Sequence, residues 1–76
     1  MIKEHDCVVL TGDLPDEGLE AGDVGAVVHI HPGAAAYEVE FVTMAGQTVA
    51  IVTLSPPQVR LVGSHDMTHV REMQTK

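Results

Sequence analysis

The fold is decided by the stretch Glu20-Ala-Gly-Asp-Val-Gly-Ala-Val-Val-His-Ile-His31, in which a tight turn runs directly into a β-branched segment. Gly22 and Gly25 bracket Asp23 in this turn. Glycine permits positive φ, and a short carboxylate can accept hydrogen bonds from the backbone of its own turn. The valines and isoleucine that follow, up to position 30, are typical of a strand buried on at least one side. We therefore expect one strand and a long loop before the turn, and the remaining strands after it.

Four other segments have the composition of strands, and they span residues 6–11, 35–42, 47–54 and 59–62. In the second of these, Tyr37, Val39 and Phe41 alternate with glutamates. Strict alternation predicts a half-buried antiparallel strand whose three large apolar side chains enter the core.

The segment before the turn, residues 12–22, has many acids and turn-forming residues but only two large apolar residues, Leu14 and Leu19. We expect these two leucines to tuck under the loop as anchors. The acids in and just after this segment are Asp13, Asp16, Glu17, Glu20 and Asp23. Their spacing does not match a calcium loop, so we expect a solvated acidic surface that would suit a basic partner.

The strand expected at 47–54 carries apolar residues on both faces. Val49 and Ile51 share one face, and the other face carries Thr48, Ala50, Val52 and Leu54. Only one face of such a strand can point into a small core, so the other must meet something else. We predict that Val49 and Ile51 form a self-association surface.

Length and composition limit the class of protein. A chain of 76 residues is one domain that buries about 60% of its unfolded surface, so oligomerisation is the most accessible source of further burial. The single cysteine, Cys7, excludes an intramolecular disulfide, and we expect it in the core because free cysteine is often buried. The absence of a long apolar run or a signal-like N-terminus indicates a cytoplasmic protein with no membrane span. A formal charge of −7 argues against nucleic-acid binding.

The composition changes after Gly63. Met67, Val70 and Met73 recur at three-residue spacing, and Ser64 stands where an N-cap would. Two alternatives stay open for this tail: a short docked helix, or a frayed end. In either case its apolar residues are candidates to cover the same surface as the fourth strand, or a neighbour's.

The family resemblance rests on four segments, which are Asp6-Cys-Val-Val-Leu, Gly22-Asp-Val-Gly-Ala-Val-Val, Ala36-Tyr-Glu-Val-Glu-Phe-Val and Thr48-Val-Ala-Ile-Val-Thr-Leu54. Together they resemble the DUF4926 family of small bacterial proteins, from about Asp6 to Val62. The resemblance implies an SH3-like β-barrel, and it brings no catalytic residue. We predict an all-β fold, a five-stranded SH3-like barrel over residues 1–62, followed by a C-terminal tail over 63–76.

Histidines provide a second set of candidate metal ligands, after the loop acids. His29 and His31 lie two apart, so their imidazoles would project from one face of a strand. His65 and His69 are four apart and would align on a helix. A structural zinc site needs four ligands, and the sequence has no Cys pair and no His-Glu-x-x-His element, so we predict no metal and no cofactor.

These observations favour a non-enzymatic protein-interaction module. It would self-associate through an interface formed by Val49, Ile51, Met67, Val70 and Met73. Its acidity suits a basic protein partner, as for an antitoxin- or immunity-like subunit. The alternative is a metal-binding protein that uses His29 and His31. No acid–base pair, phosphate loop or activated nucleophile indicates an enzyme.

Overall fold

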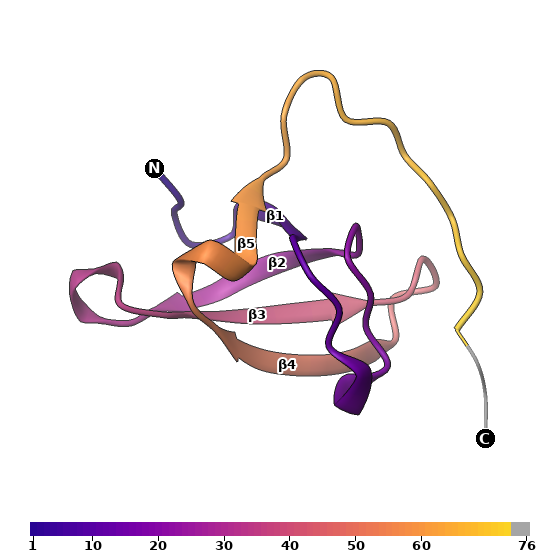
Figure 1. The fold of residues 1–76 in the computed structure, drawn as a ribbon, viewed down its shortest axis with the longest axis horizontal. Helices are drawn as coiled ribbons and strands as arrows, with labels where there is room; N and C mark the ends of the chain where they lie inside the picture. The colour runs from indigo at the N-terminus through magenta and orange to yellow at the C-terminus, as the bar shows by residue number, and fades with distance from the viewer. Residues whose placement is uncertain (74–76) are drawn as a thin grey trace.

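The computed structural model describes residues 1–73 and contains a single antiparallel sheet (Figure 1). Its strands are β1 (Cys7–Leu10), β2 (Val24–Ile30), β3 (Tyr37–Val42), β4 (Thr48–Leu54) and β5 (Val59–Leu61). Short 3-10 turns occupy Pro15–Glu17, Pro32–Ala34 and Pro56–Gln58. All five strands fall within the segments expected from the sequence, and no α-helix is present in residues 1–73.

The strands follow the order β4-β3-β2-β1-β5, which leaves β4 and β5 as the two edges. Figure 1 shows β2, β3 and β4 side by side, with β1 and β5 above them. The fold is therefore an all-β, five-stranded antiparallel sheet. The expected closure into a barrel is not made by strand pairing, because β4 and β5 are not hydrogen-bonded to each other within the described residues.

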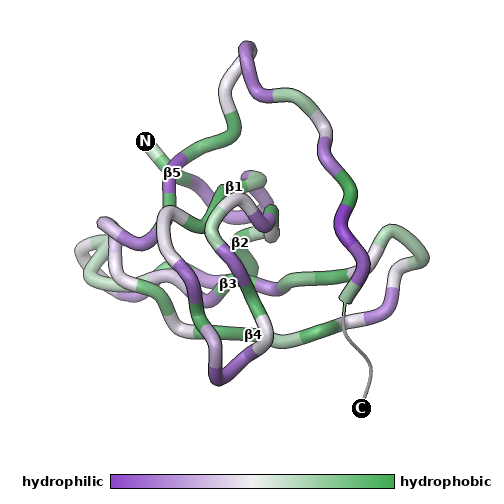
Figure 2. Tube along the Cα trace, turned by 45° about the vertical axis from the view of Figure 1, so that its right-hand side comes forward, coloured by the Kyte–Doolittle hydropathy of each residue, from purple (hydrophilic) through white to green (hydrophobic). Residues whose placement is uncertain are grey.

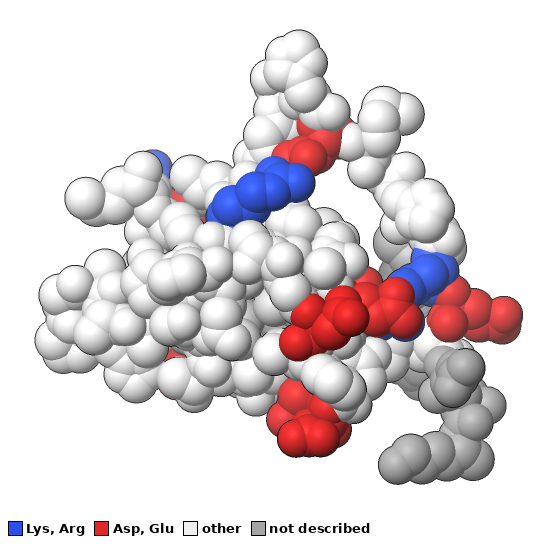
Figure 3. All heavy atoms as spheres, in the orientation of Figure 1, with Lys and Arg blue, Asp and Glu red and all other residues white. Residues whose placement is uncertain are grey.

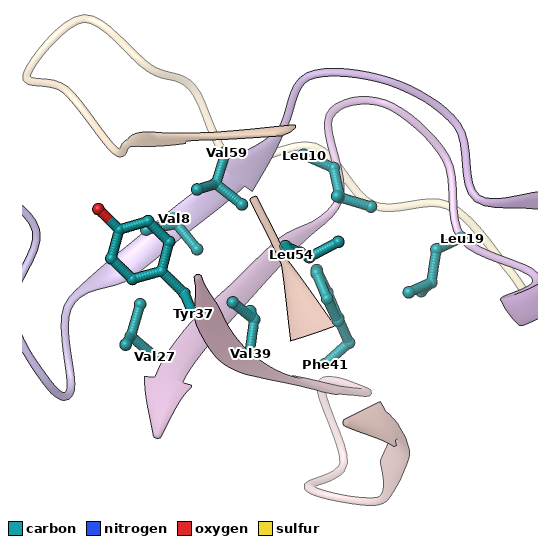
Figure 4. Close-up of a cluster of buried hydrophobic side chains, with 9 residues drawn as sticks. All are labelled: Val8, Leu10, Leu19, Val27, Tyr37, Val39, Phe41, Leu54 and Val59. Atoms are coloured by element: carbon teal, nitrogen blue, oxygen red, sulfur yellow. The ribbon is translucent and has the colours of Figure 1, made fainter. Parts of the chain in front are cut away.

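One hydrophobic core lies against the inner face of this bent sheet (Figure 4). It consists of Val8, Leu10, Leu19, Val27, Tyr37, Val39, Phe41, Leu54 and Val59. Every strand contributes at least one of these side chains. The predicted alternation in β3 is confirmed, since Tyr37, Val39 and Phe41 are all buried.

The long loop between β1 and β2 is anchored by its two leucines, as expected. Leu14 and Leu19 form an isolated antiparallel bridge, with Leu14 N donating to Leu19 O at 2.9 Å. Leu19 is buried in the core and Leu14 packs partly against it. The acidic loop is thereby fixed to the core beside the ends of β1 and β2 that it connects.

The turn into β2 uses its two glycines for different reasons. Gly22 has φ of +95°, and the Glu20 N–H donates to Asp23 Oδ2 at 2.9 Å, so the predicted carboxylate-bonded turn is confirmed. Gly25 has no positive φ. A Cβ at this position would lie 2.6 Å from Val39 Cγ1, so glycine is required there by the close approach of β3.

Two sequence-based placements are wrong. Cys7 is exposed, because the alternation of β1 turns Val8 and Leu10 into the core and Cys7 outward. Val49, which the alternation of the sequence predicts on an outer face with Ile51, packs partly against the core. The pairing of Val42 with Thr48 next to Phe41 with Ala50 leaves Val49 in an irregular register, which breaks the alternation of β4.

The tail is not helical over residues 63–73, so the helix alternative is wrong for that part. Asp66 closes a turn by accepting the Gly63 N–H at 2.6 Å, and it binds the Arg60 guanidinium through two bonds of 2.8 and 2.9 Å. Beyond it the chain is extended and arches over one side of the sheet (Figure 1). A short isolated helix is costly to nucleate, and these side-chain bonds favour the turn instead. The end of the predicted tail, residues 74–76, lies outside the described residues.

None of the helical turns in residues 1–73 is long and apolar enough to cross a membrane.

Candidate interaction surfaces

An apolar strip lies on the face of the sheet opposite the core. Val9 on β1 is paired with Val24 on β2. Val9 is not one of the residues of the core cluster, whose β1 members are Val8 and Leu10. Val24 is 50% exposed and Val42 on β3 is 48% exposed. Val9 itself is only 6% exposed, since it lies between Val24 and Arg60 on the two neighbouring strands. The sheet therefore presents apolar side chains on both faces.

The tail arches over this strip and turns it into a groove of about 1440 Å³. Figures 1 and 2 show the tail leaving the sheet after β5 and returning toward the opposite end of the sheet. Met67 and Val70 line the tail side of the groove, yet they remain 89% and 67% exposed. The tail thus spans the strip without filling the space above it.

Arg71 fastens the tail to the turn before β2. Its Nε donates to Asp23 Oδ1 at 2.8 Å, and its Nη2 donates to Asp23 Oδ2 at 2.6 Å and to the Gly18 carbonyl at 3.1 Å. The Nη1 atom lies 3.6 Å from Glu20 Oε2. This is a bidentate guanidinium–carboxylate pair with a third, neutral acceptor.

The pKa shifts of Asp23 and Arg71 agree with this hydrogen-bonded geometry. The guanidinium of Arg71 holds the pKa of Asp23 below its ordinary value, against the opposing effect of burial, and the Glu20 N–H acts in the same direction as Arg71. The carboxylate in turn raises the pKa of Arg71. Figure 3 shows acidic side chains gathered at the end of the molecule to which the tail returns. Asp23 is therefore charged and paired at neutral pH.

Two acids of the loop, Asp13 and Asp23, accept hydrogen bonds from the protein itself, so the loop is not only a solvated acidic surface as expected. Asp13 accepts the Ala21 N–H at 2.8 Å, and Asp23 accepts both the Glu20 N–H and the Arg71 guanidinium. No motif or spacing in the sequence singles out Arg71. No local signal could have found it, because Arg71 and Asp23 are 48 positions apart and no helical or strand periodicity relates them.

The structure divides the predicted interface residues into two groups. Val49, Met67, Val70 and Met73 all line the groove under the tail. Ile51 does not; it is 59% exposed on β4 and pairs in register with Glu40. Val49 and the three tail residues thus border one hollow, whereas Ile51 lies on a separate surface, and their role as an interface stays a prediction.

His29 on β2 and His31, which directly follows β2, come together. The ring centroids of His29 and His31 are 5.2 Å apart in an edge-to-face arrangement. His31 Nε2 lies 2.6 Å from Glu38 Oε2, and this bond, together with the Thr53 hydroxyl, holds the pKa of Glu38 below its ordinary value.

His65 and His69 lie exposed on the tail. No three potential metal ligands gather anywhere in residues 1–73.

The fold and these surfaces define a small all-β domain with exposed apolar surface outside its core. The chain belongs to the DUF4926 family, a domain of unknown function, whose model matches residues 4–61 and confirms the resemblance seen in the sequence. The comparisons gave no match among curated proteins and none among solved structures. Gly18, Glu20 and Asp23 lie inside the matched segment, and Arg71 lies outside it.

Proposed function

We propose that the protein is a non-enzymatic interaction module, a small SH3-like barrel that self-associates. The observation that carries this proposal is the edge strand β4, which pairs only with β3 within the described residues. The convergence of all five strands on one core supports the barrel class.

Exposed edge strands invite pairing with another chain, and monomeric proteins usually protect them with charges, prolines or bulges. The strand β4 reads Thr-Val-Ala-Ile-Val-Thr-Leu and contains no charged residue and no proline. Its side-chain content favours extended pairing, because five of its seven residues are valine, isoleucine or threonine. The single irregularity near Val49 lies toward one end of the strand. Most of this edge is therefore unprotected.

A two-fold contact between two β4 edges would satisfy the free backbone groups of both. Ile51 is the middle residue of the strand Thr48–Leu54. An antiparallel pairing centred on the strand therefore sets the two Ile51 side chains opposite each other on the outer face. Cross-strand apolar pairs of this kind contribute about 0.2–1 kcal/mol beyond the backbone bonds.

The charge of the module suits a basic protein as its further partner. The chain has 11 acidic residues against four Lys and Arg. Complementary charge raises association rates and favours basic surfaces over nucleic acid. An antitoxin- or immunity-like subunit in the cytoplasm is one form of such a module.

Light scattering coupled to size-exclusion chromatography tests the self-association. We expect the wild type to be a dimer or larger at tens of micromolar, and Ile51→Glu to be a monomer with an unchanged far-ultraviolet circular dichroism spectrum. Gln47→Glu is the matched control, since it adds the same charge at an exposed position just before β4 and should keep the wild-type mass. A wild type that stays monomeric, or an Ile51→Glu protein that keeps the assembled mass, would contradict the proposal.

A second candidate function is metal binding through His29 and His31. The observation that favours it is the 5.2 Å separation of the two rings. A four-ligand site would need further ligands from a second copy, because residues 1–73 of one chain gather no group of three. Calorimetric titration with zinc, nickel and copper tests it; absence of heat at micromolar metal would remove this candidate.

A further inference from the structure

We propose that Asp23, Glu20 and the Gly18 carbonyl form a binding site for an arginine side chain of a partner protein, and that Arg71 occupies this site as an internal competitor. The inference rests on the basic partner in the proposed function and names the group on that partner which the module would recognise.

The main acceptor, Asp23, is held by bonds that do not involve the tail. Asp23 Oδ2 accepts the Glu20 N–H at 2.9 Å, and the Asp23 carbonyl accepts the Leu10 N–H at 2.9 Å. The Gly22 N–H donates to the Leu10 carbonyl at 2.9 Å. These bonds join the turn to β1, so the carboxylate is held in position before any guanidinium arrives. Preorganised acceptors lose less entropy on binding than mobile ones.

The site discriminates between cations. It offers two carboxylate oxygens and one carbonyl oxygen to a single guanidinium, all within 3.1 Å. The planar fork of arginine can serve all three acceptors at once, whereas the compact ammonium of lysine cannot match that layout. Glu20, 61% exposed, adds a second negative charge at the rim. A hollow of about 350 Å³ between the loop and Met73 continues from this point.

Few hydrogen bonds other than its own hold Arg71 and the neighbouring tail in place. Among residues 67–73, Arg71 alone makes hydrogen bonds to the rest of the chain in the described structure. A short tether of this kind gives an effective concentration in the millimolar range. The side chain of Arg71 is 26% exposed, so solvent screens the pair and weakens it relative to a fully buried one. Arg71 therefore leaves the site often enough for another arginine to enter.

The neighbouring strip shows what would flank that arginine. Val24 and Val42 remain about half exposed beneath the tail, and Val70, which precedes Arg71, stays 67% exposed instead of covering them. The protein's own tail thus neutralises the charge of the site but leaves the apolar strip largely exposed. The partner chemistry that fits both is an extended basic segment with an apolar residue beside its arginine.

The test uses the full-length Arg71→Gln variant, which vacates the site, and N-acetyl-valyl-arginine amide as the probe. Nuclear magnetic resonance would follow the amides of Gly18, Glu20 and Asp23. We expect saturable shifts with a dissociation constant in the low millimolar range. The wild type should bind about two- to tenfold more weakly, because Arg71 competes at its millimolar effective concentration.

Two controls establish specificity. The lysine and citrulline forms of the probe should bind at least several-fold more weakly than the arginine form. Asp23→Asn, which keeps one oxygen for the turn, should abolish binding while the amides of Val39 and Phe41 keep their folded positions. Absence of saturable shifts in Arg71→Gln, or equal binding of the arginine and lysine probes, would overturn the inference.

Failure here is distinguishable from failure of the proposed function. The mass of the wild type and of Ile51→Glu reports self-association through β4, which does not involve Asp23 or Arg71. A protein that assembles through β4 but does not bind the arginine probe would overturn the arginine site alone.

Discussion

Gly25→Ala is the substitution that most directly tests how the turn, β2 and the core are coupled. Gly25 sits at the second position of β2 and faces inward, where β3 crosses closely. An added Cβ would lie 2.6 Å from Val39 Cγ1, 2.9 Å from the Glu40 carbonyl oxygen and 2.9 Å from Phe41 Cε1. All three neighbours belong to β3.

The loss in the free energy of unfolding depends on how far these three neighbours can move. The closest contact is about 0.8 Å shorter than the 3.4 Å at which ordinary contact begins. Val39 is fully buried and β-branched, so its side chain cannot move out into solvent and has few rotamers to choose from. One of the three atoms is backbone, so β2 and β3 must separate. Overpacking of this kind costs about 1–3 kcal/mol. That is a large share of the roughly 4–11 kcal/mol expected for a domain of this length.

Urea unfolding followed by circular dichroism measures this cost. Gly12→Ala is the matched control, because a Cβ there meets nothing within 4 Å and its φ is not positive. It should leave the free energy of unfolding unchanged or raise it by up to about 1 kcal/mol. A Gly25→Ala protein within about 0.5 kcal/mol of wild type would refute the close-approach explanation.

Two further predictions concern the loop and the tail. Leu19→Ala should lower the free energy of unfolding by about 2–5 kcal/mol, because Leu19 is buried in the core, whereas Leu14→Ala should cost clearly less; equal losses in urea unfolding would contradict the anchoring assigned to Leu19. The Arg60 guanidinium and then the Gly63 N–H lower the pKa of Asp66 from 3.8 to about 2. A pKa lowered by folding means that the stabilisation is complete above about pH 4 and is lost as pH falls through about 2. The carboxyl carbon resonance of Asp66 should therefore titrate with a midpoint near 2, and a midpoint near 3.8 would show that this turn does not form in solution.

Local periodicity determined most of the fold. The alternation around Tyr37, Val39 and Phe41 specified both the strand and the face that enters the core. The turn at Gly22 and Asp23 likewise placed the start of β2. Such features depend on consecutive residues, because backbone conformation and side-chain direction repeat over two to four positions. The sequence could therefore predict the five strands, the anchoring leucines and the family.

Only the tertiary structure decided where the surfaces lie. Cys7 opens an apolar run, yet its outward direction depends on which residue of β1 faces the core. The irregular register near Val49 arises from pairing between β3 and β4 and moves that side chain from an outer face toward the core. Arg71 reaches Asp23 because the tail arches back across the sheet. Contacts between residues 48 positions apart depend on the path of the whole chain, and no pattern of neighbouring residues encodes that path.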